Sequence, residues 1–189
     1  MIKAIIFDCF GVLATDGWLP FRDEYFADNS GLLARADDLN REMNTGLISY
    51  PSFLRQVAKL ANVSEELLDK RIDSNVPNTK LISFIQKQLK PRYKIGMLSN
   101  AGANWLEVIF TKPHLAIFDA VVLSYEIGAI KPDPRVYEII AEKLGVDIDS
   151  CVFIDDQQRH CIGAQQVGMQ AIQYTDFQNM KAALAKLLL

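Results

Sequence analysis

The stretch IIFDCFGVL, residues 5 to 13, decides the fold, because an apolar run ends there in an aspartate. Ile5, Ile6 and Phe7 are large or β-branched and apolar on both faces, which is typical of a parallel strand covered by helices. Asp8 follows directly, and Phe10 stands two residues later. A carboxylate at the carboxyl end of a buried strand lies where open α/β sheets bind their ligands.

Four further short apolar runs have the same character, and helical patterns lie between them. One helix is predicted to begin at Pro134, with Asp133 as its N-cap and Gly145 as its C-cap. ANWLEVIF (103–110) has a helical pattern, and another helix opens with Thr175 and Gln178 in capping-box spacing. The alternation predicts an α/β fold with a doubly wound parallel sheet. The expected strands are KAIIFD (3–8), KIGMLS (94–99), AVVLS (120–124), CVFID (151–155) and MQAIQY (169–174).

Residues 15–88 interrupt this alternation and contain no convincing strand pattern. Several stretches instead show helical periodicity, and Ser64 is expected to begin one helix and residue 78 another. We therefore predict an α/β core made of residues 1–14 and 89–189, with residues 15–88 inserted as an all-helical cap. The two hinges of this cap are expected near Leu13–Asp16 and Lys90–Tyr93.

The composition is that of a folded globular protein, since 50% of the 189 residues are hydrophobic and 23% are charged. The net charge of −3 and the lack of a basic block argue against nucleic acid as a partner. No signal peptide or membrane span is indicated. The three cysteines form no CxxC pair, so we expect a cytoplasmic protein with reduced thiols.

Polar side chains follow the expected strands where their carboxyl ends meet at one edge of the sheet. Each of them alone has a common structural role, such as capping a turn, so the interpretation depends on the combination. They are Asp8 after the first strand, Ser99 and Asn100 at the second, Lys131 after the third, and Asp155 and Asp156 at the fourth.

Three carboxylates at one point raise one another's pKa unless a cation offsets their charge. A hard divalent ion with oxygen ligands, Mg²⁺, suits this set. Lys131 and Ser99 are left to hold an anion, and a phosphoryl group fits both. Asp8 is then the candidate nucleophile, which would attack phosphorus to form an aspartyl-phosphate, while the metal and Lys131 offset the charge on the phosphoryl oxygens.

Four motifs in this order resemble those of the haloacid dehalogenase-like (HAD) superfamily of hydrolases, over the whole chain. The helical insert between the first two motifs is similar to that of the helical-cap phosphatases, which include sugar-phosphate phosphatases. The motifs are FDCFGVL (7–13), MLSN (97–100), IKPDPRVYE (130–138) and VFIDDQQRHCIGAQQVGMQAI (152–172). The resemblance implies a Rossmann-like core, a nucleophile at Asp8, phosphate binding by Ser99, Asn100 and Lys131, and Mg²⁺ binding by Asp8, the Phe10 carbonyl, Asp155 and Asp156.

Two positions depart from the family pattern. Phe10 stands where most family phosphatases have a second aspartate, which protonates the leaving group and later activates water. Loss of such general acid–base catalysis typically costs ~10²- to 10⁴-fold in rate. His160 stands where the family usually has asparagine. Two roles are open for this histidine: a polar residue at a helix start, or an alternative proton carrier.

Because Phe10 replaces the usual second aspartate, three interpretations of the protein's function are open. The first is a Mg²⁺-dependent phosphatase that acts on a small phosphorylated metabolite, such as a sugar phosphate, through an aspartyl-phosphate. The second is a phosphate-binding or regulatory protein that has lost turnover. The third is a metal-independent 2-haloacid dehalogenase, whose relatives carry an aromatic residue at this position, although Asp155 and Asp156 argue against it.

The cap is expected to select the substrate. Trp18, Arg22 and Tyr25 are candidates to face the site, because they lie just after the first strand. The expected partner is a small phosphorylated metabolite, with no nucleic acid and no membrane, and the protein is expected to be a monomer or a small homo-oligomer.

Overall fold

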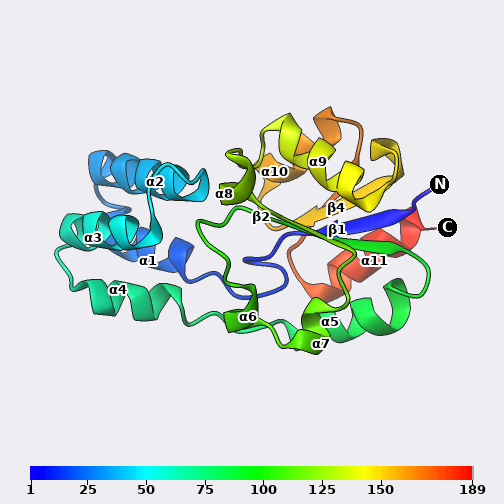
Figure 1. Cartoon of the computed structure of the whole chain (residues 1–189), viewed down its shortest axis with the longest axis horizontal. Helices are drawn as coiled ribbons and strands as arrows, with labels where there is room; N and C mark the ends of the chain where they lie inside the picture. The colour runs from blue at the N-terminus through cyan, green and yellow to red at the C-terminus, as the bar shows by residue number, and fades with distance from the viewer. Residues whose placement is uncertain (189) are drawn as a thin grey trace.

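A twisted parallel sheet forms the centre of the protein, as the computed structural model shows for residues 1–188 (Figure 1). The strand order is β3-β2-β1-β4-β5, and every pairing is parallel. All five predicted strands are present, and their ends shift by no more than one residue. Their bounds are β1 (Ala4–Phe7), β2 (Lys94–Ser99), β3 (Ala120–Leu123), β4 (Cys151–Asp155) and β5 (Gln170–Gln173).

Helices cover both faces of the sheet, as the predicted doubly wound fold requires. Side chains alternate across β1, so that Ile5 and Phe7 pack into one buried cluster while Ala4 and Ile6 pack into the other. The first cluster is covered by α5 (Thr79–Phe84), the π-helical turn η1 (Ile85–Leu89) and α11 (Phe177–Leu187). The second is covered mainly by α9 (Pro134–Leu144) and α10 (Gln158–Gln166).

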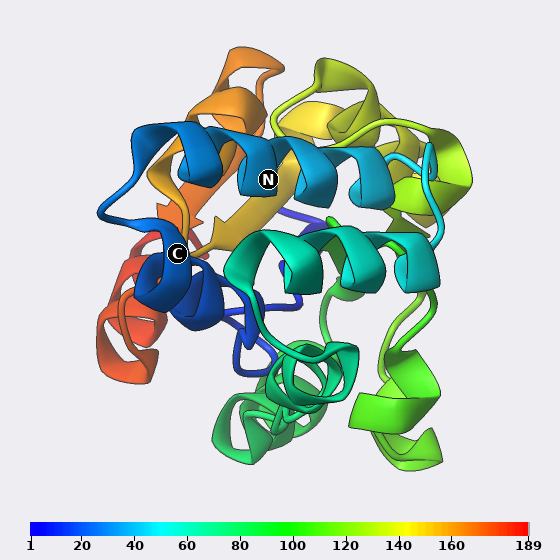
Figure 2. The ribbon, with the colours of Figure 1, turned by 90° about the vertical axis from the view of Figure 1, so that its left-hand side faces the viewer.

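The inserted cap lies beyond the carboxyl ends of the strands and has its own apolar core (Figures 1 and 2). Phe21, Phe53 and Leu68 are among its buried side chains. This cluster is distinct from the two apolar clusters on the faces of the sheet. The cap helices are α1 (Trp18–Phe26), α2 (Ser30–Asn44), α3 (Tyr50–Ala61) and α4 (Glu65–Ile72).

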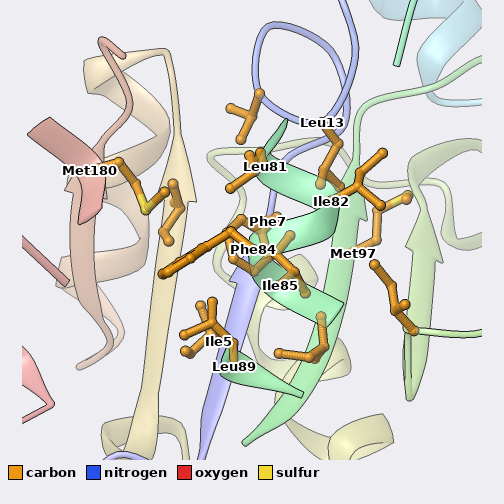
Figure 3. Packing of buried hydrophobic residues seen from close by; sticks show 14 of the residues in the cluster. Ile5, Phe7, Leu13, Leu81, Ile82, Phe84, Ile85, Leu89, Met97 and Met180 are labelled. Carbon is orange, nitrogen blue, oxygen red and sulfur yellow. The ribbon is translucent and has the colours of Figure 1, made fainter. Parts of the chain in front are cut away.

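The helix predicted from residue 78 packs against the sheet and not with the cap helices. Figure 3 shows Leu81, Ile82 and Ile85 of this helical segment beside Phe7 of β1. The two connections to the cap lie side by side, because the amide of residue 15 donates to the carbonyl of residue 76 at 3.0 Å. We therefore propose a cap boundary near residue 77, in place of residue 88 and of the hinge near Lys90–Tyr93.

Local helix signals were correct in some places and wrong in others. Asp133 caps α9 by accepting from the Arg135 amide, and Gly145 ends it at φ +63°, as predicted. Ser64 likewise caps α4. Thr175 does not cap the last helix, because the Asp176 carboxylate accepts from the Gln178 and Asn179 amides instead.

The segment 103–110 forms a shorter helix than predicted. Only α6 (Leu106–Ile109) is helical there, and its N-cap position, Trp105, makes no side-chain capping bond. Trp105 instead lies in the loop after β2. The remaining short elements are α7 (Lys112–Leu115), α8 (Ser124–Ile127) and the 3₁₀ turn η2 (Ile148–Ser150). None of the helices within residues 1–188 combines the length and the apolar character needed to span a bilayer.

Candidate active site

The sheet register places two carboxylates side by side. Phe7 of β1 pairs with Ile154 of β4, so Asp8 and Asp155 follow at the same level on neighbouring strands. The Asp8 amide donates to the Ile154 carbonyl at 2.9 Å, which extends the hydrogen-bond ladder by one residue. Both residues are almost fully buried, with exposures of 4% for Asp8 and 0% for Asp155.

Lys131 joins these two carboxylates. Its Nζ lies 2.7 Å from Asp8 Oδ1 and 2.7 Å from Asp155 Oδ2, and the side chain is buried. Burial alone would lower the pKa of Lys131, but the charges of Asp155 and Asp8 outweigh it and raise that pKa. The ammonium therefore stays charged throughout the physiological range.

Asn100 holds the backbone from which Lys131 projects. Its Oδ1 accepts from the Lys131 amide at 2.8 Å, and its Nδ2 donates to the Lys131 carbonyl at 3.3 Å. The phosphate-binding role of Asn100 stays a prediction, and the structure adds this two-way clamp made by its side-chain amide. The sequence held no local signal for the clamp, because the two residues lie on different loops.

Asp156 lies beneath the loop that follows β1. A Cβ atom at Gly11 would stand 2.6 Å from Asp156 Oδ2, so only glycine, here at φ +83°, permits this close approach. The Oδ1 atom is buried and has no hydrogen-bond partner among the described residues. Burial, followed by the charge of Asp155, raises the pKa of Asp156 to about 6. Such an orphaned carboxylate oxygen fits a cation ligand.

Asp8 also ionises less readily than an ordinary aspartate. Burial and then the charge of Asp155 raise its pKa well above the usual range, although Lys131 opposes both effects. Asp155 behaves oppositely: burial alone would raise its pKa, but Lys131 and His160 lower it strongly. One lysine thus does not offset all the negative charge of the cluster, which is the condition under which a divalent cation binds.

Ser99 and Phe10 are the remaining predicted site residues. Ser99 ends β2, is 1% exposed, and its Oγ has no hydrogen-bond partner within residues 1–188. A buried hydroxyl without a partner fits an oxygen atom of a ligand. Phe10 is half-buried, packs against the core cluster around Phe7, and lines the cleft.

His160 faces Asp155 from the first turn of α10. Its Nδ1 lies 3.0 Å from Asp155 Oδ1, and its Nε2 is buried without a partner among the described side chains. Burial lowers the pKa of His160, so the neutral ring is favoured. Asp8, Asp155 and His160 offer potential ligand atoms that all lie within 4.8 Å of one another. However, Asp155 already accepts from Lys131 and from the Gln157 amide.

A cleft of about 920 Å³, including its part open to solvent, lies between the strand ends and the cap. Asp8, Lys131 and His160 lie along it, and Trp18 and Arg22 of α1 line it as predicted. Tyr25 does not line it, because its ring stacks on Phe21 with centroids 4.4 Å apart. Several other lining residues could not be predicted, because no local pattern shows which helix of the insert faces the sheet. They include Asn40, Asn44, Tyr50 and Trp105.

Replacing Lys131 with methionine should destabilise the fold by about 3–5 kcal/mol, because Asp8 and Asp155 are then buried without their cation. The loss, measured by urea unfolding, should be larger at pH 8 than at pH 5, since protonation relieves an unpaired carboxylate. The matched control is Lys143→Met on the exposed face of α9, which should change stability by less than about 0.5 kcal/mol. Equal stability of the two variants would contradict the ion pairing.

A family model and several known phosphatases are similar to this chain in sequence. A family model described as haloacid dehalogenase-like hydrolase matches residues 2–168. A sesquiterpene phosphatase of Aspergillus oryzae is 33% identical over 180 residues, which cover 92% of this chain and 90% of that protein. A phosphatase of Mycobacterium tuberculosis is 51% identical over 55 residues, which cover 29% of this chain but only 25% of that protein.

Solved structures show the same fold. A HAD family enzyme of Bacteroides thetaiotaomicron, crystallised with magnesium and inorganic phosphate, has a TM-score of 0.74 to this chain. The two are 23% identical, and the match covers 95% of this chain and 99% of that one. The matched family model, the parallel sheet and the residues gathered at its edge lead to one conclusion: this chain belongs to the haloacid dehalogenase-like hydrolases.

Proposed function

We propose that this chain is a Mg²⁺-dependent phosphatase that hydrolyses a small phosphorylated metabolite through an aspartyl-phosphate at Asp8. The observation that carries the proposal is the buried contact of 2.7 Å between Asp8 Oδ1 and Lys131 Nζ. The partnerless Ser99 Oγ at the same edge of the sheet supports it. A nucleophile, a fixed ammonium and a free hydroxyl are together suited to a phosphoryl group.

In this mechanism the Asp8 carboxylate oxygen attacks phosphorus and the bond from phosphorus to the ester oxygen breaks. Lys131 and the Ser99 hydroxyl bind the phosphoryl oxygens, and the leaving group departs with its electron pair. Water then attacks phosphorus, which releases inorganic phosphate and restores the Asp8 carboxylate. Phe10 has no proton to give, so an alkoxide or phenolate must leave with little proton assistance.

The donor set fits a magnesium ion. Asp8, the backbone carbonyl of Phe10 and Asp156 would hold it, and the orphaned Asp156 oxygen supports this choice. When bound, the ion supplies positive charge that offsets the charge of the phosphoryl group. Asp155 was also a predicted ligand. We propose instead that it orients Lys131, because its oxygens already accept from Lys131 and His160.

The two alternatives remain distinct hypotheses. A phosphate-binding protein without turnover would keep Lys131 and Ser99 in place but would hydrolyse no ester. A metal-independent dehalogenase has no use for the negative charge of Asp156 beside two buried carboxylates, so the structure favours phosphatase chemistry. Cytoplasmic action is also part of the proposal, which the three buried, unpaired cysteines support.

The test is a panel of phosphorylated metabolites and aryl phosphates, assayed with Mg²⁺ and with EDTA. Mg²⁺-dependent release of inorganic phosphate is expected. Phosphate binding without release would instead support the regulatory interpretation. Release of halide from a 2-haloacid in EDTA would support the dehalogenase.

Mg²⁺ affinity should weaken as the pH falls through about 6, because a protonated Asp156 no longer offers a charged ligand. Titration calorimetry at pH 8, 7, 6 and 5 should show affinity falling by up to tenfold per pH unit below about 6. The Asp156→Asn variant should bind Mg²⁺ weakly at every pH. The part of the pH dependence that comes from protonation of Asp156 should then disappear. An unchanged affinity from pH 8 to pH 5 would exclude Asp156 as a ligand.

A further inference from the structure

The wall of the cleft beyond Asp8 is aromatic on both sides. Trp18 and Tyr50 belong to the cap, and Trp105 belongs to the loop after β2. The Tyr50 and Trp105 rings meet edge to face, with centroids 4.5 Å apart. Aromatic side chains from both cap and core therefore border the space that the leaving group would occupy, and they favour planar, apolar groups.

The same wall offers little positive charge. Arg22 binds the carboxylates of Asp23 at 2.6 Å and Asp37 at 3.3 Å, and Lys131 is committed to the catalytic carboxylates. The third lining cation, Arg159, is exposed and donates to the Gln157 side chain. A second anionic group on the substrate would therefore find only this exposed cation at the edge of the cleft.

Carboxylates outnumber the available cations along the cleft. Asp16, Asp37 and Asp73 line it in addition to Asp8. Burial raises the pKa of Asp16, and partial burial together with the charge of Asp69 raises the pKa of Asp73. A carboxylate or second phosphate on the leaving group would add like charge at this place.

Two side-chain amides on the cleft wall can hydrogen-bond a substrate. Asn40 and Asn44 line the cleft from α2. An amide both donates and accepts. The cleft thus offers aromatic surface together with one or two neutral polar contacts.

We propose that the alcohol part of the substrate is an uncharged, ring-bearing group, and that Trp105 and Tyr50 select it. The inference rests on the proposed function, because the phosphoryl group must lie at Asp8 for the ring to reach this wall. It assigns to Trp105 a role in specificity and names the substrate class as phosphate monoesters of neutral cyclic or aromatic alcohols.

The test measures binding of non-hydrolysable phosphonates by titration calorimetry in the presence of Mg²⁺. Phenylphosphonate should bind about tenfold more tightly than methylphosphonate, which corresponds to about 1.4 kcal/mol. Between two ligands of the same shape, 3-carboxyphenylphosphonate should bind about tenfold more weakly than 3-carbamoylphenylphosphonate, with a smaller difference at high salt.

Trp105→Ala should remove most of the advantage of phenylphosphonate over methylphosphonate, whereas Trp105→Phe should keep most of it. The matched control is Val108→Ala in α6, since Val108 is 68% exposed and does not line the cleft. This control should leave the ratio of the two affinities unchanged. If Trp105→Ala and Val108→Ala reduced the advantage of phenylphosphonate over methylphosphonate equally, the cause would be a general disturbance of the loop. That result would overturn the role of Trp105.

Measurements of binding and of turnover distinguish the proposed preference for a ring-bearing alcohol from the proposed phosphatase activity. Absence of Mg²⁺-dependent hydrolysis of any ester would refute the phosphatase, while the phosphonate series would still report the preference for a ring. Hydrolysis of acetyl phosphate together with equal affinity for phenylphosphonate and methylphosphonate would overturn the inference alone. Tighter binding of the carboxylate ligand than of its amide would also overturn it.

Discussion

Asp8→Asn is expected to lower phosphatase turnover by a factor on the order of 10⁴ or more, while the fold stays intact. Asparagine has nearly the same shape as aspartate, but its amide oxygen is a poor nucleophile. It still accepts a hydrogen bond from the Cys9 amide, which donates to Asp8 Oδ1 at 2.6 Å. Lys131 keeps Asp155 as its charged partner.

The measurement is phosphate release with Mg²⁺, alongside thermal unfolding of the variant. Asp147→Asn is the matched control, because the Asp147 side chain is 79% exposed and pairs with Lys3 on the surface. This control should keep wild-type turnover. Substantial Mg²⁺-dependent activity in Asp8→Asn would disprove the assignment of the nucleophile.

Phe10→Asp is expected to raise the rate on simple alkyl phosphates by ~10²- to 10⁴-fold, because it restores a proton donor for the leaving group. The gain should be small for aryl and acyl phosphates, whose leaving groups depart without a proton. In the wild type, rates should depend strongly on leaving-group pKa. The intermediate at Asp8 should accumulate and give a burst before steady turnover.

Phe10→Asn is the matched control, since it removes the same half-buried ring without adding an acid. The ratio of rates between the two variants isolates the proton transfer from the lost packing. A wild-type enzyme that cleaves alkyl and aryl phosphates at similar chemical-step rates would mean that another residue already supplies the proton. His160 would be the first to test, because it lines the same cleft.

Much of the fold was predictable from short-range signals. The central strands are apolar on both faces and end in polar residues, so their number, type and approximate ends followed from periodicity. Asp133 and Gly145 fixed the ends of α9 because capping depends only on nearby backbone. Thr175 failed as a cap because the neighbouring Asp176 offers a stronger acceptor to the same amides.

What local pattern does not contain is the choice of packing partner. The helix from Thr79 has the same apolar periodicity whether it covers the sheet or joins the cap, so its place depends on tertiary contacts with Phe7. The same holds at the site. That Asp8, Lys131 and Asp155 come together was predictable from their places after the carboxyl ends of parallel strands. The clamp of Asn100 on Lys131 and the pairing of Tyr50 with Trp105 were not predictable in this way.

The central strand β1 is made before either of its neighbours during synthesis. Ala4 pairs with Lys94 on one side and with Cys151 on the other. At typical elongation rates the ribosome takes on the order of ten seconds to produce the chain between Ala4 and Cys151. Throughout that interval β1 lacks at least one of its neighbouring strands. The cap helices, in contrast, depend mainly on contacts between residues close in sequence. We expect the nascent chain to acquire a folded cap first and to close its sheet last, with IIF (5–7) as the segment that chaperones must shield.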